Sequence, residues 1–358
     1  MKRLRALVRT TLVVALATIA SACHAPSGGG VDDAAAVDDG SLRIRGAGAT
    51  FPEPLYQEWL DRYSEVTPEV AFSYVGVGSG EGIRRFIAEE VDFGASDAAM
   101  SDAEIARVTR GVELIPATAG MVVLAYNLPG VAGDLRLPRD VYVDIFLGRI
   151  WRWDNPRIVA ANPHLDLPAK VIQTVVRRDG SGTTFAFTSH LSAISVVWRD
   201  EGPGIGKEID WPGGAMAVKG NEGVAQRVKL SPGTIGYMEY GFARRLGLPI
   251  ATLENRAGRF VRPDAASGSA ALAAAADAMP SDLRLFLPDP AGPDSYPVVS
   301  LSWILAYGRY SEPARAEALK GLFRWALQDG QPVAETLGYI PLPEPIATKA
   351  ATAVAEIR

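Results

Sequence analysis

From Leu42 onward, runs of β-favouring residues alternate with segments that repeat apolar residues at helical spacing. The segment 54–66 places its large apolar residues on one helical face, which predicts an amphipathic helix: Leu55, Trp59, Leu60 and Tyr63. Similar patterns predict helices over 82–90, 184–195, 265–278 and 315–328, and strands over 71–77, 91–95, 121–126 and 171–176. Strands separated by helices are typical of an α/β fold with mostly parallel sheets, in which ligands bind beyond the carboxyl ends of the strands.

The first 23 residues have the features of an export signal. Four positive charges precede an apolar run over 11–20: Lys2, Arg3, Arg5 and Arg9. A helix needs about 20 residues to span the ~30 Å hydrocarbon core of a bilayer, so this run is too short to do so. A charged start, a short apolar core and small residues before Cys23 predict a secretory signal over 1–23.

Cys23, the only cysteine, follows small residues in a pattern that resembles the lipobox of bacterial lipoproteins. We expect it to become the lipidated first residue of the mature chain, and simple cleavage without lipidation is the alternative. Residues 24–41 contain four aspartates, no lysine or arginine and few large apolar side chains, which predicts a flexible tether. A lipid anchor and tether would hold a folded body near a membrane without a transmembrane span.

Length, charge and motif content exclude several classes of protein. At roughly 150 residues per domain, 358 residues predict about two domains. The formal charge of −5 becomes −9 without the four positive charges of the signal, which argues against nucleic acid as a partner. Neither C-x-x-C nor H-E-x-x-H occurs, so no standard zinc site is expected. G-x-x-x-x-G-K-[ST] and G-x-S-x-G are missing too, which argues against a P-loop and an α/β-hydrolase nucleophile.

Glycine and serine concentrate in four stretches that we interpret as strand-to-helix turns: 46–52, 76–82, 92–97 and 177–184. One such turn is commonly an ordinary connection with a helix cap. The start of a helix, however, presents unpaired N–H groups and a partial positive charge, which together bind oxyanions. Several such helix starts, with arginine in the last stretch, indicate short-range recognition of an anion by a protein of acidic net charge.

The same stretches carry a resemblance to a known family. They read GAGATFP (46–52), VGSGEGI (77–83), VDFGASDA (91–98) and RRDGSGTTFAFTS (177–189), and NEGVAQRV (221–228) agrees as well. Together they resemble the periplasmic phosphate-binding proteins of high-affinity phosphate ABC transporters, over essentially all of 42–345. The resemblance implies the type II periplasmic-binding-protein fold, with two α/β domains joined by a two-strand hinge. Domain I would comprise 42–117 plus 296–358, and domain II would comprise 118–295.

The resemblance also implies a set of phosphate ligands and one supporting residue. Asp179 matches the aspartate that fixes the family's arginine, and Arg177 matches that arginine. Two residues depart from the family pattern, Glu53 and Arg178, and we expect both to point to solvent. The implied ligands are Thr50, Phe51 (through its backbone), Ser79, Asp97, Arg177, Ser181, Gly182 (through its backbone) and Thr183.

These matches imply an exported receptor, either periplasmic or on the outer face of the cytoplasmic membrane, and we expect it to be lipid-anchored. It would bind inorganic phosphate between its domains and deliver it to the permease subunits of an ABC importer. No catalytic residue, cofactor or metal is expected, and the membrane would be contacted only through the anchor. A receptor for sulfate, molybdate or phosphonate is an alternative. A phosphohydrolase is a further one, although a metal cluster and a Ser-His pairing are lacking. Asp97 favours phosphate, because an ionised carboxylate accepts a hydrogen bond from P–OH, which sulfate lacks.

Overall fold

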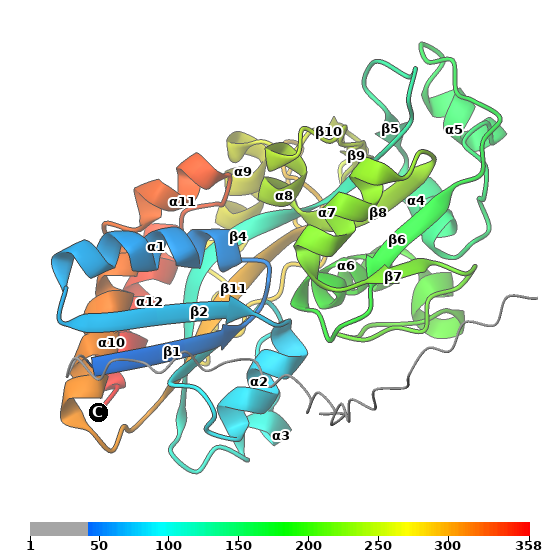
Figure 1. Cartoon of the computed structure of the whole chain (residues 1–358). Coiled ribbons are helices and arrows are strands. Elements are labelled where there is room, and N and C mark those ends of the chain that lie inside the picture. Colours follow the sequence, from blue (N-terminus) through cyan, green and yellow to red (C-terminus); the bar gives the residue numbers. More distant parts are fainter. Residues whose placement is uncertain (1–41) are drawn as a thin grey trace, which may run out of the picture. The chain divides into compact units, whose positions relative to one another are not determined.

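A mixed eight-stranded sheet runs through the computed structural model, which describes residues 42–358 (Figure 1). Its strands lie in the order β2-β1-β3-β11-β4-β8-β6-β7, and a smaller sheet has the order β10-β9-β5. The strands are β1 (Leu42–Gly48), β2 (Val70–Gly76), β3 (Phe93–Ser96), β4 (Val112–Tyr126), β5 (Arg136–Leu137), β6 (Gln173–Arg177), β7 (Met216–Val218), β8 (Thr234–Glu239), β9 (Thr252–Glu254), β10 (Phe260–Val261) and β11 (Val299–Tyr307). The predicted signal, the lipidation of Cys23 and the tether lie outside the described residues.

The predicted helices are all present in the structure. Those over 54–66, 82–90, 184–195, 265–278 and 315–328 correspond to α1, α2, α6, α9 and α10, with ends that differ by at most three residues, and the other helices were not predicted. The helices are α1 (Glu53–Val66), α2 (Ser79–Ile87), α3 (Asp102–Ile105), α4 (Arg139–Phe146), α5 (Pro156–Ala161), α6 (Gly182–Ile194), α7 (Gly220–Leu230), α8 (Tyr240–Arg245), α9 (Ala265–Ala276), α10 (Pro313–Leu327), α11 (Gln331–Leu337) and α12 (Glu344–Glu356), with a π-helical turn η1 (Val197–Glu201).

Two long strands at the centre of the sheet make its topology mixed. β1 pairs in parallel with β2 and β3, and β6 pairs in parallel with β7 and β8. Between these groups, β11 pairs antiparallel with β3 and β4, and β4 pairs antiparallel with β8. The prediction of mostly parallel sheets is therefore correct for the outer strands and wrong for the centre.

β4 connects the two groups of parallel strands and is longer than the predicted strand over 121–126. Its first part, up to Met121, pairs with β11, and its last five residues pair with β8. The register with β11 shifts between Ser302 and Trp303, opposite Pro116. Proline has no N–H to donate, and a bulge at this point lets the strand continue past it. The chain thus passes along β4 from one group of parallel strands to the other.

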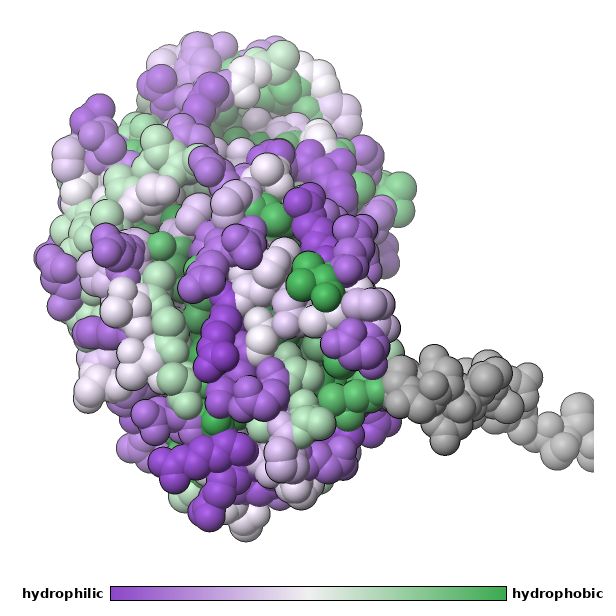
Figure 2. Space-filling model, turned by 90° about the vertical axis from the view of Figure 1, so that its left-hand side faces the viewer, coloured by the Kyte–Doolittle hydropathy of each residue, from purple (hydrophilic) through white to green (hydrophobic). Residues whose placement is uncertain are grey.

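Helices cover the strands and enclose an apolar core. α1 packs on β2, α2 on β3 and α12 on β4. α7 and α6 both pack on β8, and Figure 1 draws α7 in front of it and α6 behind. Large side chains fill the interior, where Trp153, Trp198 and Trp303 are almost fully buried. Figure 2 shows polar and apolar residues interspersed on one face of the surface. Within residues 42–358, no helix has the length and apolar character needed to cross a bilayer.

Candidate functional site

The structure brings the four glycine-rich stretches together beyond the ends of β1, β2, β3 and β6. The backbone N–H groups of Val77 and Gly78 both donate to the carbonyl of Gly48, at 2.8 and 2.9 Å. The N–H of Ala49 donates to the carbonyl of Ala95 at 2.9 Å, and that of Gly80 donates to Gly180 at 2.8 Å. The predicted meeting of these stretches at one site is therefore observed in the backbone contacts.

The third stretch combines a predicted strand with a turn shorter than expected. β3 (Phe93–Ser96) largely confirms the strand predicted over 91–95, is buried throughout and is paired on both sides, so most of the stretch 92–97 is strand and not turn. Asp97 stands directly after this strand, and no helix begins there, since α3 starts only at Asp102. The contribution of this stretch is therefore the carboxylate of Asp97 and not a helix start.

Thr50 and Phe51 lie in the turn between β1 and α1. Thr50 is 6% exposed, and Phe51 is completely buried. The hydroxyl of Tyr339 donates to the carbonyl of Phe51 at 2.7 Å, and the two rings lie 6.2 Å apart between centroids. These contacts hold the peptide that follows Thr50 in a fixed position.

Ser79 and Asp97 are in direct contact, and both are almost fully buried. Asp97 donates its backbone N–H to Oγ of Ser79 at 3.2 Å, and Ser302 on β11 donates its hydroxyl to Oδ1 of Asp97 at 2.8 Å. Burial raises the pKa of Asp97 to about 7, although the hydrogen bond from Ser302 and the charge of Arg177 lower it. A carboxylate in this position ionises near neutral pH, and once ionised it can accept a hydrogen bond from a protonated oxygen of a ligand.

Arg177 at the end of β6 forms a buried ion pair with Asp179. Nε of Arg177 donates to Oδ1 of Asp179 at 2.8 Å, and its Nη2 donates to Oδ2. Asp179 also accepts from the N–H of Gly220 at 3.0 Å, at the start of α7. Burial would raise the pKa of Asp179, but the hydrogen bonds and charge of Arg177 outweigh it and hold the pKa below its usual value. The pair thereby fixes the guanidinium plane.

Ser181, Gly182 and Thr183 form the beginning of α6. The hydroxyl of Ser181 accepts a hydrogen bond from the N–H of Thr184 at 3.0 Å, which caps the helix. Gly182 has no room for a side chain, because a Cβ atom there would lie 2.6 Å from both Cβ of Asp97 and Oγ of Ser79. Only glycine lets the first turn of α6 approach Ser79 and Asp97 this closely.

Further hydrogen bonds join the segments that the sequence assigns to different domains. Asn221 donates its side-chain N–H to Oγ1 of Thr50 at 3.0 Å. Lys207 forms an ion pair of 2.7 Å with Glu104, and both side chains are about three-quarters buried. The structure thus holds the two sides of the candidate site in contact, whereas the predicted division into two domains remains a prediction.

Asn221 is, like Ser302, a buried polar residue of this cluster to which the sequence analysis gave no role. Its side chain contacts the hydroxyls of both Thr50 and Thr183. The sequence signal was present in the stretch 221–228, which matches the family, but nothing in the stretch itself shows that it folds back onto Thr50.

The two departures from the family pattern have different outcomes. Arg178 is exposed, as expected, while the neighbouring Arg177 is buried. Glu53 does not simply point to solvent, because it is half-buried and its Oε1 accepts a hydrogen bond of 2.8 Å from the N–H of Gly76. The expectation for Glu53 is therefore wrong: its carboxylate ties the first turn of α1 to the end of β2.

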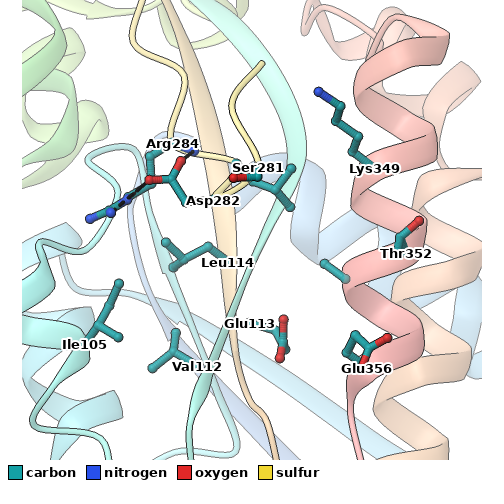
Figure 3. Close-up of a pocket in the computed structure, with 12 residues that line it drawn as sticks. Ile105, Val112, Glu113, Leu114, Ser281, Asp282, Arg284, Lys349, Thr352 and Glu356 are labelled. Atoms are coloured by element: carbon teal, nitrogen blue, oxygen red, sulfur yellow. Dashed lines mark hydrogen bonds and ion pairs between the residues drawn. The ribbon is translucent and has the colours of Figure 1, made fainter.

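A separate cavity of about 430 Å³ lies between β4, α12 and the 281–284 loop (Figure 3). Figure 3 shows the ion-paired Arg284 and Asp282 on one side and Lys349 and Glu356 along α12 on the other. None of the residues that line it belongs to the candidate ligand set. This cavity is therefore distinct from the cluster around Arg177.

Comparison with known proteins identifies the family. A family model described as a PBP superfamily domain matches residues 27–329. The chain is 41% identical over 307 residues to the phosphate-binding protein PstS of Pasteurella multocida, covering 86% of this chain and 88% of that one. It is 37% identical over 341 residues to PstS of Methanocaldococcus jannaschii, covering 89% and 87% of the two chains. The chain belongs to the PstS family.

Solved structures support the fold of this PstS family member. A phosphate-binding protein from Stenotrophomonas maltophilia has a TM-score of 0.72 at 18% identity, over 87% of this chain and 94% of that one. A periplasmic phosphate-binding protein called PfluDING, solved with phosphate bound, has a TM-score of 0.70 at 23% identity, over 88% and 93% of the two chains. The family resemblance and the α/β periplasmic-binding-protein fold stated from the sequence are confirmed.

Proposed function

We propose that this protein binds inorganic phosphate in the cluster around Arg177 and delivers it to the permease subunits of an ABC importer. The ligands proposed are those expected from the sequence: Thr50, Phe51, Ser79, Asp97, Arg177, Ser181, Gly182 and Thr183. Relatives of 37 to 41% identity over most of the chain are named phosphate-binding proteins, which supports the same ligand here.

The observation that carries the proposal is the buried arrangement of one cation, several hydroxyls and one carboxylate. Arg177 uses Nε–H and one N–H of Nη2 on Asp179. A guanidinium has five N–H donors, so the edge formed by Nη1 and Nη2 keeps donors for a bidentate contact with an oxyanion. Hydroxyl and backbone donors around this edge would replace the water that a phosphate loses on burial.

The carboxylate of Asp97 favours phosphate over other oxyanions. Phosphate near neutral pH carries at least one P–OH, which can donate to an ionised carboxylate. Sulfate carries no proton, so its oxygens would face the lone pairs of Asp97 without a hydrogen bond. Sulfate and molybdate would therefore bind in this cluster less well than phosphate.

We infer a binding role and not a catalytic one. His190 offers no general base at the cluster, because it is fully buried and its ring nitrogens contact the hydroxyl of Tyr142 and the carbonyl of Pro288, each at 2.7 Å. Burial also lowers the pKa of His190 to about 4, so it is neutral at physiological pH. The non-enzymatic names of the relatives support the same inference.

We further propose that the protein acts outside the cytoplasmic membrane and is attached to it only through a lipid on Cys23. The sequence of residues 1–41 supports this location, as argued from its signal, lipobox and acidic stretch.

Titration calorimetry tests the binding function. The protein is first freed of bound anion by partial unfolding in urea and dialysis, then titrated with phosphate, arsenate and sulfate. We expect saturable binding of phosphate and of arsenate, which is also protonated near neutral pH, and much weaker binding of sulfate. Tight sulfate binding without phosphate binding would show that the second reading, a receptor for another oxyanion, is right. Hydrolysis of a chromogenic phosphomonoester by the pure protein would instead support an enzyme.

A further inference from the structure

Asn221, the second residue of α7, connects the two threonine hydroxyls of the candidate site. Its side-chain Nδ2 donates to Oγ1 of Thr50 at 3.0 Å and to Oγ1 of Thr183 at 3.2 Å. Its backbone N–H donates to Oγ1 of Thr50 at 3.2 Å as well. All three side chains are buried, so water does not compete for these contacts.

The orientation of the Asn221 amide is fixed from its other end. The backbone N–H of Glu239, where β8 meets α8, donates to Oδ1 of Asn221 at 3.0 Å. A backbone N–H can only donate, so the oxygen of the amide must face Glu239. The NH₂ group of Asn221 must then face Thr50 and Thr183, which means that it is a donor to both hydroxyls.

A hydroxyl that accepts from its neighbours has its own proton free for another partner. A threonine hydroxyl has two lone pairs and one proton. Both lone pairs of Thr50 are used by donors of Asn221. The hydroxyl of Thr183 accepts from Asn221 and, at a longer 3.5 Å, from Nη1 of Arg177. Neither proton can point back at these donors, so both must point elsewhere, and a fully deprotonated or partly protonated oxyanion offers them acceptors.

We propose that Asn221 is a positioning residue that makes the hydroxyls of Thr50 and Thr183 donors to the bound phosphate. The proposal rests on the proposed function, because it assumes that an anion occupies the cluster. Asn221 would not contact the anion but would set the direction of two of its hydrogen bonds. An asparagine that merely filled space in the core would have no such effect on the hydroxyl protons.

The substitution Asn221→Asp distinguishes a role in positioning the two hydroxyls from a role in merely filling space in the core. Aspartate has nearly the same shape and still accepts from the N–H of Glu239, but when ionised it can only accept. The proton of Thr50 would then be drawn to Asp at position 221, and the hydroxyl would present lone pairs to the anion. We expect phosphate affinity to fall by about 100-fold or more, a size in keeping with lost hydrogen bonds to a charged group.

A double-mutant cycle with Thr50→Val distinguishes this effect from simple repulsion between the new carboxylate and the anion. In the Thr50→Val background there is no hydroxyl proton to redirect at that position. The factor by which Asn221→Asp weakens phosphate binding should therefore be at least ten times smaller in this background than in the wild type. Repulsion alone would give the same factor in both backgrounds, and that result would overturn the proposal.

Two further measurements complete the test. Asn127→Asp is the matched control, because this substitution makes the same change of charge. The side chain of Asn127 donates only to the backbone carbonyls of Val228 and Lys229 in the structure. The substitution should leave phosphate affinity within about twofold, on the ground that the partners of Asn127 carry no hydroxyl proton to redirect. If Asn221→Asp does not fold, as judged by urea unfolding without phosphate, the same cycle is run with Asn221→Ala. Equal factors in both backgrounds would again overturn the proposal. If wild type and Asn127→Asp both fail to bind phosphate, the proposed function itself is wrong.

Discussion

The hydroxyl of Ser302 on β11 donates a hydrogen bond of 2.8 Å to Oδ1 of Asp97. Oδ1 thereby accepts a hydrogen bond from β11, one of the two central strands of the sheet, and the carboxylate lies beside Ser79 of the candidate site. Because Asp97 is almost fully buried, it is costly for this carboxylate to meet a ligand that cannot donate to it.

The first prediction is that Asp97 discriminates between phosphate and sulfate. At pH 8, above the pKa of about 7, Asp97 is ionised and can accept from P–OH but not from sulfate. An unpaired buried charge costs several kcal/mol, and ~1.4 kcal/mol corresponds to a tenfold change, so we expect a preference of ~10³ or more. Asp97→Asn introduces an amide that can donate, so sulfate should lose its penalty while phosphate retains much of its binding.

The measurement is the ratio of phosphate to sulfate affinity in wild type and Asp97→Asn, at pH 8 and one salt concentration. A ratio that the substitution leaves unchanged would mean that Asp97 only packs against Ser79 and does not recognise the proton of the ligand.

The second prediction concerns the pH dependence of stability without phosphate. Burial raises the pKa of Asp97 from 3.8 to about 7, so the folded protein binds this proton more tightly than the unfolded chain does. The contribution of Asp97 to the free energy of unfolding is therefore present at low pH and is lost as the pH rises towards 7. The variant Asp97→Asn has no ionisable group at this position, so its stability lacks this dependence on pH.

The free energy of unfolding of Asp97→Asn minus that of wild type should accordingly increase by about 2 to 3 kcal/mol between pH 5 and pH 8, at ~1.4 kcal/mol per pKa unit. Urea unfolding in phosphate-free buffers measures it. Burial also raises the pKa of Glu239 to about 8. This effect of burial is the same in both proteins and cancels in the difference, and only the smaller effect of the Asp97 charge on Glu239 is lost in the variant. A difference that is the same at both pH values would contradict the inferred burial of an ionisable Asp97.

The third prediction contrasts two neighbouring arginines. Arg177 is buried against Asp179, whereas Arg178 is exposed. Arg177→Ala removes the proposed bidentate donor and leaves the carboxylates of Asp97 and Asp179 without their cation. Phosphate binding should weaken by ~2–5 kcal/mol, as expected for truncating one partner of a buried charge pair.

Arg178→Ala is the matched control and should change the affinity little, because solvent screens an exposed charge. Calorimetric titration of both variants with phosphate checks the contrast. Equal losses would show that the anion is not held by the arginine at the end of β6.

The fourth prediction is that Cys23 carries the membrane attachment. Cys23→Ser should move the protein from the membrane fraction to the soluble fraction of cells that export it. The phosphate affinity of the released protein should equal that of a chain beginning at Leu42, since residues 1–41 contribute no proposed ligand. Retention of Cys23→Ser in the membrane fraction would rule out the lipid anchor.

The sequence predicted several of the local elements well, because they depend on short patterns, and the candidate ligands come from short motifs in the same way. The apolar face of 54–66 and the glycine-rich stretches report on the residues beside them. The antiparallel centre of the sheet could not be predicted in this way, because β11 lies more than 170 residues from β4 and pairs with it through long-range contacts. The strand predicted over 91–95 is largely confirmed by β3, but the stretch 92–97 was also interpreted as a turn because it contains glycine and serine, whereas pairing on both sides keeps Phe93–Ser96 in the sheet.

The same reason explains the two errors in the site. Asn221 and Glu53 gain their partners from segments distant in sequence, Thr50 in one case and Gly76 in the other. A polar residue whose partner is set by the fold cannot be told from a solvent-exposed one by its neighbours in the chain. The family motif, by contrast, distinguished Arg177 from Arg178 through its position relative to Ser181, and the structure shows Arg177 buried against Asp179 and Arg178 exposed.

The position of the anion in a crystal structure grown with phosphate tests the account most directly. We predict phosphate within hydrogen-bond distance, about 2.7–3.2 Å, of the guanidinium of Arg177, the hydroxyls of Thr50, Ser79, Ser181 and Thr183, and the carboxylate of Asp97. Phosphate absent from this cluster at saturating concentration, or bound instead in the cavity beside Arg284 and Lys349 (Figure 3), would contradict it.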